Sequence, residues 1–111
     1  MKPEPKRRML SLLGLAQRAG KLAPGSSRAG GAVKGGKAQG VLICTDLSAK
    51  SKKEFRFLCE REDVPFWEPD VTIEDLSAAI GFRAGGCALC DPGFARSVAA
   101  LTISNGKDDT V

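Results

Sequence analysis

The sequence PGSSRAGGAVKGGK, residues 24–37, lies between a segment with helical periodicity and an apolar run typical of a buried strand. It contains five glycines, two serines and three lysine or arginine residues, with no acidic or aromatic residue. A helix that begins with Gly and Ser has free backbone N–H groups at the positive end of its dipole, which suit phosphate or another anion. The segment therefore predicts an anion-binding helix start. The alternative is a surface helix with flexible ends and no ligand.

Helical and strand patterns alternate on both sides of this segment. Before it, apolar residues recur at i, i+3, i+4 and i+7 from Met9, and Gly20 ends the helix. After it comes a continuous apolar run that suits a strand covered on both faces. In all, we expect helices at 9–19, from Ser26 or Ser27 onward, at 51–62, 72–80 and 92–101, and strands at 21–22, 41–45, 64–67 and 87–90. We expect Ser26 or Ser27 to cap the second of these helices. This alternation predicts the α/β class, as a three-layer α-β-α sandwich with a small mixed four-stranded sheet.

Three capping patterns support the later helix starts. Ser51, with Glu54 three residues later, predicts a capping box. Thr72 is a suitable N-cap for the next helix. Asp91 before Pro92 gives the last helix an N-cap followed by proline at its first position, where the missing N–H has no helical partner to lose.

The length of 111 residues predicts one domain whose core needs no disulfide. We expect a basic N-terminal arm at 1–8, a single domain at 9–103 and a disordered tail at 104–111. No apolar run approaches the ~20 residues of a membrane span, and polar residues interrupt the apolar region after the N-terminal cations, so no signal peptide is expected. We therefore expect a soluble, cytoplasmic protein without membrane contact, and we take it to be a monomer.

The charge of the chain is unevenly distributed, although its net value is only +4. From Met1 to Arg56, 13 lysines and arginines stand against three acids, whereas from Phe57 onward four stand against ten. Such a basic half repels itself unless an anionic partner or the acidic half neutralises it. Its clustering beside residues 24–37 favours a polyanion, of which nucleic acid is the commonest. The alternative is a charged surface that only keeps the protein soluble.

The four cysteines favour buried free thiols over a metal or redox site. Cys44 and Cys59 fall in a strand pattern and a helix pattern, and Cys87 and Cys90 form a single C-x-x-C pair. A zinc site usually needs two such pairs, and on a strand the two cysteines of this pair would point to opposite faces. The chain has no histidine, which excludes acid–base catalysis and metal ligation by imidazole.

Two further classes of protein fit the sequence poorly. Gly31, Gly36 and Lys37 have phosphate-loop spacing, but Ala38 replaces the hydroxyl that binds magnesium, and a strand follows where a helix should. The chain also has five Phe, one Trp and no Tyr, and three of the phenylalanines fall on core-facing stripes. Few rings remain for a protein that binds single strands by stacking.

Several short motifs, spread over residues 10–101, occur in a characteristic order. They are LGLAQRAGKL at 13–22, GGKA at 35–38, VLI at 41–43 with Asp46, SKK at 51–53, VP at 64–65, AIG at 79–81 and DPGFA at 91–95. In order and spacing the chain resembles the small ribosomal and kink-turn RNA-binding superfamily, in its bacterial YlxQ-like branch. The resemblance covers nearly the whole predicted domain.

The resemblance implies a ribosome-associated RNA-binding protein with no catalytic activity, cofactor or metal. In this superfamily the RNA lies on the start of the second helix and on the loop before the last strand. Carried over by position, the first surface comprises Gly25, Ser26, Ser27, Arg28, Gly31 and Lys34, and the second comprises Phe82, Arg83 and Ala84. Gly25 would allow close approach of the sugar-phosphate backbone, and Lys34 would contact a phosphate.

The chain departs from the superfamily pattern at five of these positions. Strong kink-turn binders carry Asn or Lys where Ser27 stands, Glu or Gln where Arg28 stands, and usually Lys where Gly31 stands. Those longer side chains contact base edges, whereas an arginine at 28 favours sequence-independent phosphate contacts. At 83 and 84 the chain has Arg and Ala in place of a usually acidic and apolar pair. The alternative function is a protein-interaction module that keeps the fold and has lost specific RNA binding.

Overall fold

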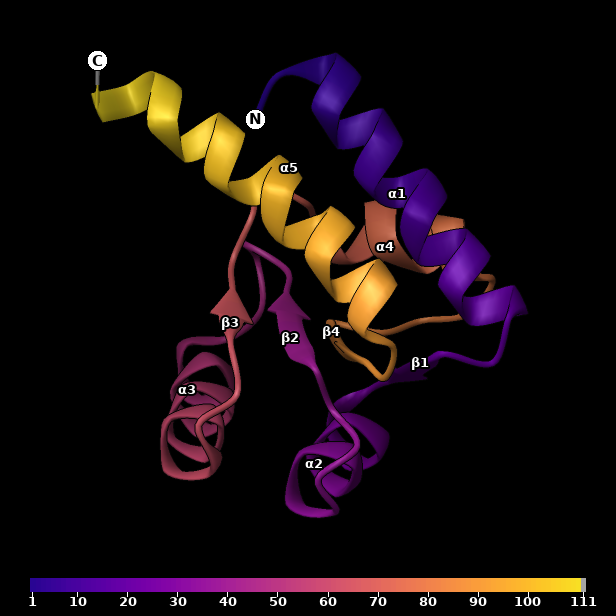
Figure 1. The fold of residues 1–111 in the computed structure, drawn as a ribbon, viewed down its shortest axis with the longest axis vertical. Coiled ribbons are helices and arrows are strands. Elements are labelled where there is room, and N and C mark those ends of the chain that lie inside the picture. The colour runs from indigo at the N-terminus through magenta and orange to yellow at the C-terminus, as the bar shows by residue number, and fades with distance from the viewer. Residues whose placement is uncertain (111) are drawn as a thin grey trace.

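The computed structural model describes the backbone of residues 1–110 and the side chains of residues 1–102. Helices and strands alternate throughout this part of the chain (Figure 1). The elements are α1 (Pro3–Arg18), β1 (Leu22–Pro24), α2 (Ser26–Lys34), β2 (Gly40–Ile43), α3 (Ala49–Glu62), β3 (Phe66–Trp67), α4 (Ile73–Ile80), β4 (Gly86–Leu89) and α5 (Pro92–Thr110). Within the described residues, no helix combines the length and the hydropathy that a membrane crossing requires.

The four strands form one mixed sheet in the order β1-β4-β2-β3. Strand β4 is antiparallel to β1 and β2, and β3 is parallel to β2, so β1, β2 and β3 all point in one direction. Helices α1, α4 and α5 lie on one face of the sheet, and α2 and α3 lie on the other (Figure 1). The predicted α/β class, with helices in two layers around a mixed four-stranded sheet, is confirmed.

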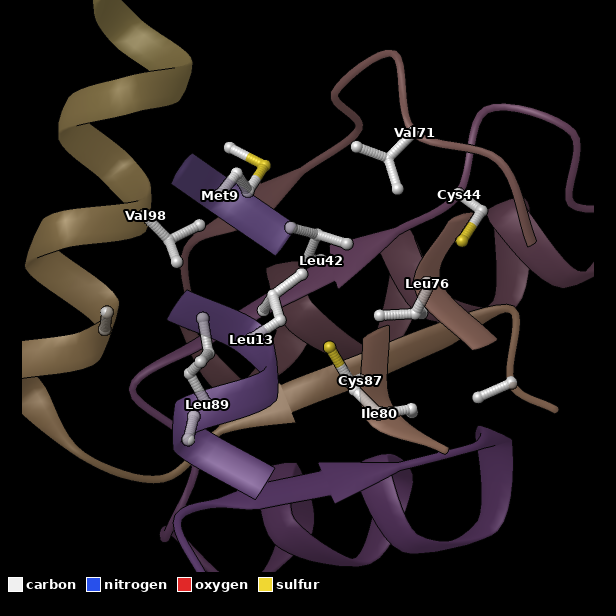
Figure 2. Packing of buried hydrophobic residues seen from close by; sticks show 13 residues of the cluster. Met9, Leu13, Leu42, Cys44, Val71, Leu76, Ile80, Cys87, Leu89 and Val98 are labelled. Carbon is white, nitrogen blue, oxygen red and sulfur yellow. The ribbon is translucent and has the colours of Figure 1, made fainter. Parts of the chain in front are cut away.

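Each face of the sheet has its own hydrophobic cluster, since every residue of β2 and β4 is buried. Alternate residues of a strand point to opposite faces. Accordingly, Leu42 and Cys87 pack with α1, α4 and α5, whereas Val41 and Ala88 pack with α2 and α3. Figure 2 shows the first cluster, in which Met9, Leu13, Leu76, Ile80 and Val98 gather around Leu42, Cys87 and Leu89.

The first helix begins earlier than its apolar periodicity predicts. The sequence suggested an arm at 1–8 and a helix from residue 9, but α1 starts at Pro3, which occupies the first helical position. Proline is favourable there because its φ is already helical and its missing N–H would have no partner. Long-range contacts hold this end: Lys6 Nζ lies 2.9 Å from Asp75 Oδ2, and the N-terminal ammonium lies 3.3 Å from Asp70 Oδ2.

Of the three predicted helix caps, two are confirmed and one is wrong. Thr72 and Asp75 form a reciprocal capping box at the start of α4, and Asp91 Oδ2 accepts a hydrogen bond from the Phe94 backbone N–H at 3.0 Å. Helix α3, in contrast, begins at Ala49, two residues before the expected cap Ser51. Its N-cap is Ser48, whose hydroxyl oxygen accepts from the Ser51 backbone N–H.

All four cysteines are free thiols, and three of them are buried; Cys90 is half-buried. Burial raises the pKa of Cys44 to about 12 and that of Cys59 to about 11. It also raises the pKa of Cys87 and Cys90. Cys87 packs in the cluster of α1, α4 and α5, and Cys90 packs against the cluster of α2 and α3, so the predicted opposite orientation of the pair is confirmed. These surroundings disfavour the thiolate form that reacts and binds metals.

The last helix extends into the segment expected to be disordered. The backbone of α5 is helical to Thr110, which includes most of the expected tail at 104–111. Residue 111, and the side chains from 103 onward, lie outside the described residues. The division of the chain into arm, domain and tail stays a prediction.

Candidate nucleic-acid interface

The start of α2 and the loop before β4 lie at the same edge of the sheet. Because β1, β2 and β3 run in one direction, their carboxyl ends meet at one edge, and α2 and α3 both begin there. Strand β4 runs the opposite way, so residues 81–85, which precede it, reach the same edge. The Gly25 backbone N–H donates to the Gly86 carbonyl oxygen at 2.8 Å. The structure thus makes the two predicted binding segments neighbours, at the edge where open α/β sheets commonly bind ligands.

The first turn of α2 exposes backbone donors and short side chains. Its N-cap is Gly25, whose φ of 88° and ψ of 156° are essentially restricted to glycine. The first helical bond joins the Ala29 N–H to the Gly25 carbonyl oxygen at 2.9 Å, so the N–H groups of Ser26, Ser27 and Arg28 have no intrahelical acceptor. All three residues are exposed. The expectation that a serine caps α2 is wrong, because the sharp turn out of β1 places glycine at that position.

The exposed face of α2 continues this surface. Gly31 is exposed, and a Cβ built there would have no neighbouring atom within 4 Å. Lys34, one turn further along, is also exposed. A ligand could therefore approach the helix backbone closely at Gly31 while the Lys34 ammonium contacts an anionic group.

Cations near this edge have few acidic partners. Lys52 Nζ lies 2.7 Å from Glu68 Oε2, and Lys6 pairs with Asp75. Five exposed cations on α2, the start of α3 and the loop before β4, however, form no ion pair within residues 1–102: Arg28, Lys34, Lys50, Lys53 and Arg83. The acidic half of the chain thus neutralises only part of the basic half. Part of the remaining positive charge lies at this edge, and part lies on other surfaces, at Arg8, Arg18, Lys21, Lys37, Arg56 and Arg96.

The loop before β4 offers two of its three predicted residues. Phe82 is 40% exposed, and Arg83 is exposed. Ala84 is buried in the hydrophobic cluster, and its N–H donates to the Ser77 hydroxyl oxygen at 3.1 Å. Neither the methyl group nor the N–H of Ala84 is therefore free for a ligand, and its structural part is to fix the loop against α4.

Comparison with known proteins shows the family of the chain. The sequence model described as the ribosomal protein L7Ae/L30e/S12e/Gadd45 family matches residues 7–99. The chain belongs to this family. No curated protein sequence matches it.

Two solved structures illustrate the likeness to other proteins with this fold. A Bacillus halodurans protein of unknown function is 32% identical, with a TM-score of 0.81, over 86% of this chain and 96% of its own. A Giardia lamblia 15.5kD RNA binding protein has a TM-score of 0.74 at 18% identity, over 94% of this chain and 89% of its own. At that identity the second likeness concerns the fold alone.

In this member of the L7Ae/L30e/S12e/Gadd45 family, a pocket of about 180 Å³ opens between α2 and α3. One stripe of each helix lines it: Ser26, Gly30 and Lys34 from α2, and Ser51, Glu54, Phe55 and Leu58 from α3. Sequence analysis missed this pocket, although the signal was present. Ser26, Gly30 and Lys34 follow one another at i, i+4 and i+8 on one stripe of α2, and the first two are too small to fill the space beside a neighbouring helix.

Proposed function

We propose that this protein binds structured RNA through its phosphate backbone, at the edge where the start of α2 meets the loop before β4. The observation that carries the proposal is the cluster of exposed cations without acidic partners beside the unpaired N–H groups of α2. Such a surface suits the evenly spaced negative charges of a nucleic acid. The binding residues would be Gly25, Ser26, Ser27, Arg28, Gly31, Lys34, Phe82 and Arg83, with Ala84 holding the loop in place.

The family supports the choice of RNA. Membership of the L7Ae/L30e/S12e/Gadd45 family connects the chain with ribosomal proteins, and one protein of the same fold is named for RNA binding. We infer a ribosome-associated, cytoplasmic, monomeric protein of the YlxQ-like branch, without catalytic activity, whose RNA-binding domain spans residues 9–103. Ser27, Arg28 and Gly31 favour phosphate contacts over base contacts, so we expect a weak preference for kink-turns over other folded RNAs.

A titration at two salt concentrations tests this function. The purified protein is titrated with fluorescently labelled RNA that contains a kink-turn, and with a plain RNA duplex. Because the contacts are ionic, affinity should fall steeply with added salt for both RNAs. Lys34→Ala and Arg28→Ala should each weaken both complexes and reduce the slope of log K against log salt by about one unit or less.

The matched control is Arg96→Ala. Arg96 is exposed on α5, across the sheet from α2, and forms no ion pair within residues 1–102. This substitution removes the same charge and should change affinity less than either variant in α2. Equal effects of all three variants would show that the RNA binds to another surface of the protein.

If the protein has no affinity for either RNA, the alternative function as a protein-interaction module is favoured. Phe57 on α3 and Leu15 on α1, which are 64% and 48% exposed, are apolar residues that a protein partner could cover.

A further inference from the structure

The pocket between α2 and α3 presents a carboxylate and an ammonium group that the fold itself does not use. Glu54 on α3 and Lys34 on α2 both line it. Neither side chain forms an ion pair or a hydrogen bond with any residue in 1–102. Ser26, the first residue of α2, lines the same pocket, so the pocket adjoins the surface assigned to the RNA backbone.

The floor of the pocket is apolar and carries no side chain on the α2 side. A Cβ built at Gly30 would lie 3.8 Å from Leu58 Cδ2, so the two helices meet there and a ligand would lie over this contact. Leu58, which is half-buried, supplies most of the apolar surface on the α3 side, because Phe55 is only 6% exposed. A nucleobase unstacked from an RNA loop or bulge needs such a combination of apolar walls and a few polar groups at its edge.

The two polar groups select among the bases. A carboxylate only accepts hydrogen bonds and an ammonium only donates them. The guanine edge carries two adjacent donors, N1–H and the N2 amino group, beside the acceptor O6. Glu54 could accept from both donors and Lys34 could donate to O6, whereas adenine and cytosine offer the carboxylate one amino group and uracil offers one N–H.

We propose that this pocket binds an unstacked guanine of the RNA whose backbone lies on α2. The inference rests on the proposed function and adds base specificity to it. The position of Glu54 on α3 makes this readout independent of residues 27, 28 and 31, where the chain lacks the usual base-reading side chains.

The test uses four hairpin RNAs that differ only in one bulged nucleotide, G, A, C or U, at constant salt. The wild-type protein should bind the G-bulge RNA about tenfold more tightly than the others. Glu54→Gln should remove most of this preference, because an amide cannot accept two hydrogen bonds from guanine in the same way. Glu60→Gln, an exposed position on α3 outside the pocket, makes the same charge change and should keep the preference.

Alanine substitutions at two neighbouring glycines test whether the base occupies the pocket. Gly30→Ala adds a methyl group to the pocket wall, and Gly31→Ala adds one in open space on the same helix. Both variants should fold, since the nearest atom is at an ordinary contact distance in the first and absent in the second. Gly30→Ala should reduce the preference for the G-bulge RNA severalfold, whereas Gly31→Ala should weaken the binding of all four RNAs by the same factor and so keep the preference.

Free guanosine monophosphate separates the two sources of guanine. It should bind far more weakly than the G-bulge RNA, because it carries a single phosphate and lacks the neighbouring phosphates of the RNA backbone that contact α2. Binding as tight as that of the RNA would indicate a site for free nucleotides and overturn the assignment to RNA. Equal affinity for all four bulges, or equal loss of preference in Glu54→Gln and Glu60→Gln, would show the pocket assignment to be wrong while RNA binding stands. Absence of any RNA affinity would reject both proposals.

Discussion

At the scale of single residues, Gly25 and Gly31 differ in whether the fold requires glycine at that position. Gly25 adopts a φ of 88° that a side chain would strain. Gly31 has ordinary helical angles and open space where a Cβ would lie, so nothing in the fold requires glycine there. A residue that lowers helix stability without a structural need is a good candidate for a functional position.

We expect opposite effects of alanine at these two glycines. Gly31→Ala should raise the free energy of unfolding by about 1 kcal/mol through helix propensity. Gly25→Ala should lower it by about 1–3 kcal/mol, because alanine strains the backbone at these angles. Thermal and urea unfolding of the two variants measure the difference. Stabilisation by both substitutions would contradict the backbone conformation of Gly25.

The same position tests the RNA surface. If RNA approaches the α2 backbone at Gly31, Gly31→Ala should weaken RNA binding although it stabilises the free protein. Gly31→Lys should instead strengthen binding, because it adds a cation beside the proposed phosphate path. If both variants bind RNA as the wild type does, α2 is not the RNA surface.

At the scale of elements, an ion pair couples the start of α1 to the start of α4. The Lys6 ammonium, and next the Thr72 backbone N–H, hold the pKa of Asp75 below its ordinary value of 3.8. Asp75 in turn raises the pKa of Lys6. This contact, together with the packing of Met1 against the cluster of α1, α4 and α5, explains why α1 is helical well before its apolar stripe begins.

The Asp75 contact should appear in the acid stability of the protein. Its folded-state pKa is lowered, so its contribution is complete above its unfolded pKa of about 4 and is lost as the pH falls through the folded value. Asp75→Asn should therefore be less stable than the wild type at pH 7, and the difference should shrink below about pH 4. Urea unfolding between pH 2.5 and 7 measures this. Glu74→Gln, an exposed neighbour on α4 without an ion pair within residues 1–102, is the control; a gap between wild type and Asp75→Asn that does not change with pH would contradict the coupling.

At the scale of the whole molecule, a sheet covered on both faces separates the protein into two hydrophobic clusters. Both clusters contain cysteines. Cys44 and Cys87 lie in the cluster of α1, α4 and α5, whereas Cys59 lies in the cluster of α2 and α3, with Cys90 packed against it. Burial raises the pKa of all four thiols. Their reactivity therefore reports on the opening of each cluster.

Thiol labelling of the native protein near pH 8 should be slow and confined at first to Cys90, the half-buried thiol. The other three should react only as the protein unfolds, because their thiolate forms are strongly disfavoured by burial. Cys90→Ala should abolish the early reaction and leave the rest unchanged, as measured by mass spectrometry with time. Rapid native labelling of a second cysteine, or stoichiometric zinc in the purified protein, would contradict this arrangement.

The sequence by itself determined the local structure. Helical periodicity, the caps at Thr72 and Asp91 and the apolar run of β2 depend on residues close together in the chain, so they predicted the element order and the α/β class. The basic stretch around residues 24–37 is likewise the local feature on which the proposed polyanion surface rests. Apolar periodicity could not predict the start of α1 at Pro3, because contacts with Asp70 and Asp75, which are distant in the sequence, hold its first turns.

Only the tertiary structure decided which distant segments of the chain are neighbours. The strand order places Gly25 next to Gly86 and brings the start of α2 to the loop before β4. Parallel strands β1, β2 and β3 set α2 and α3 side by side, which creates the pocket of Lys34 and Glu54. Burial of Ala84 likewise depends on its packing against α4. These features arise from pairings between residues far apart in the chain, and such long-range pairings are set by the global fold rather than by any local pattern.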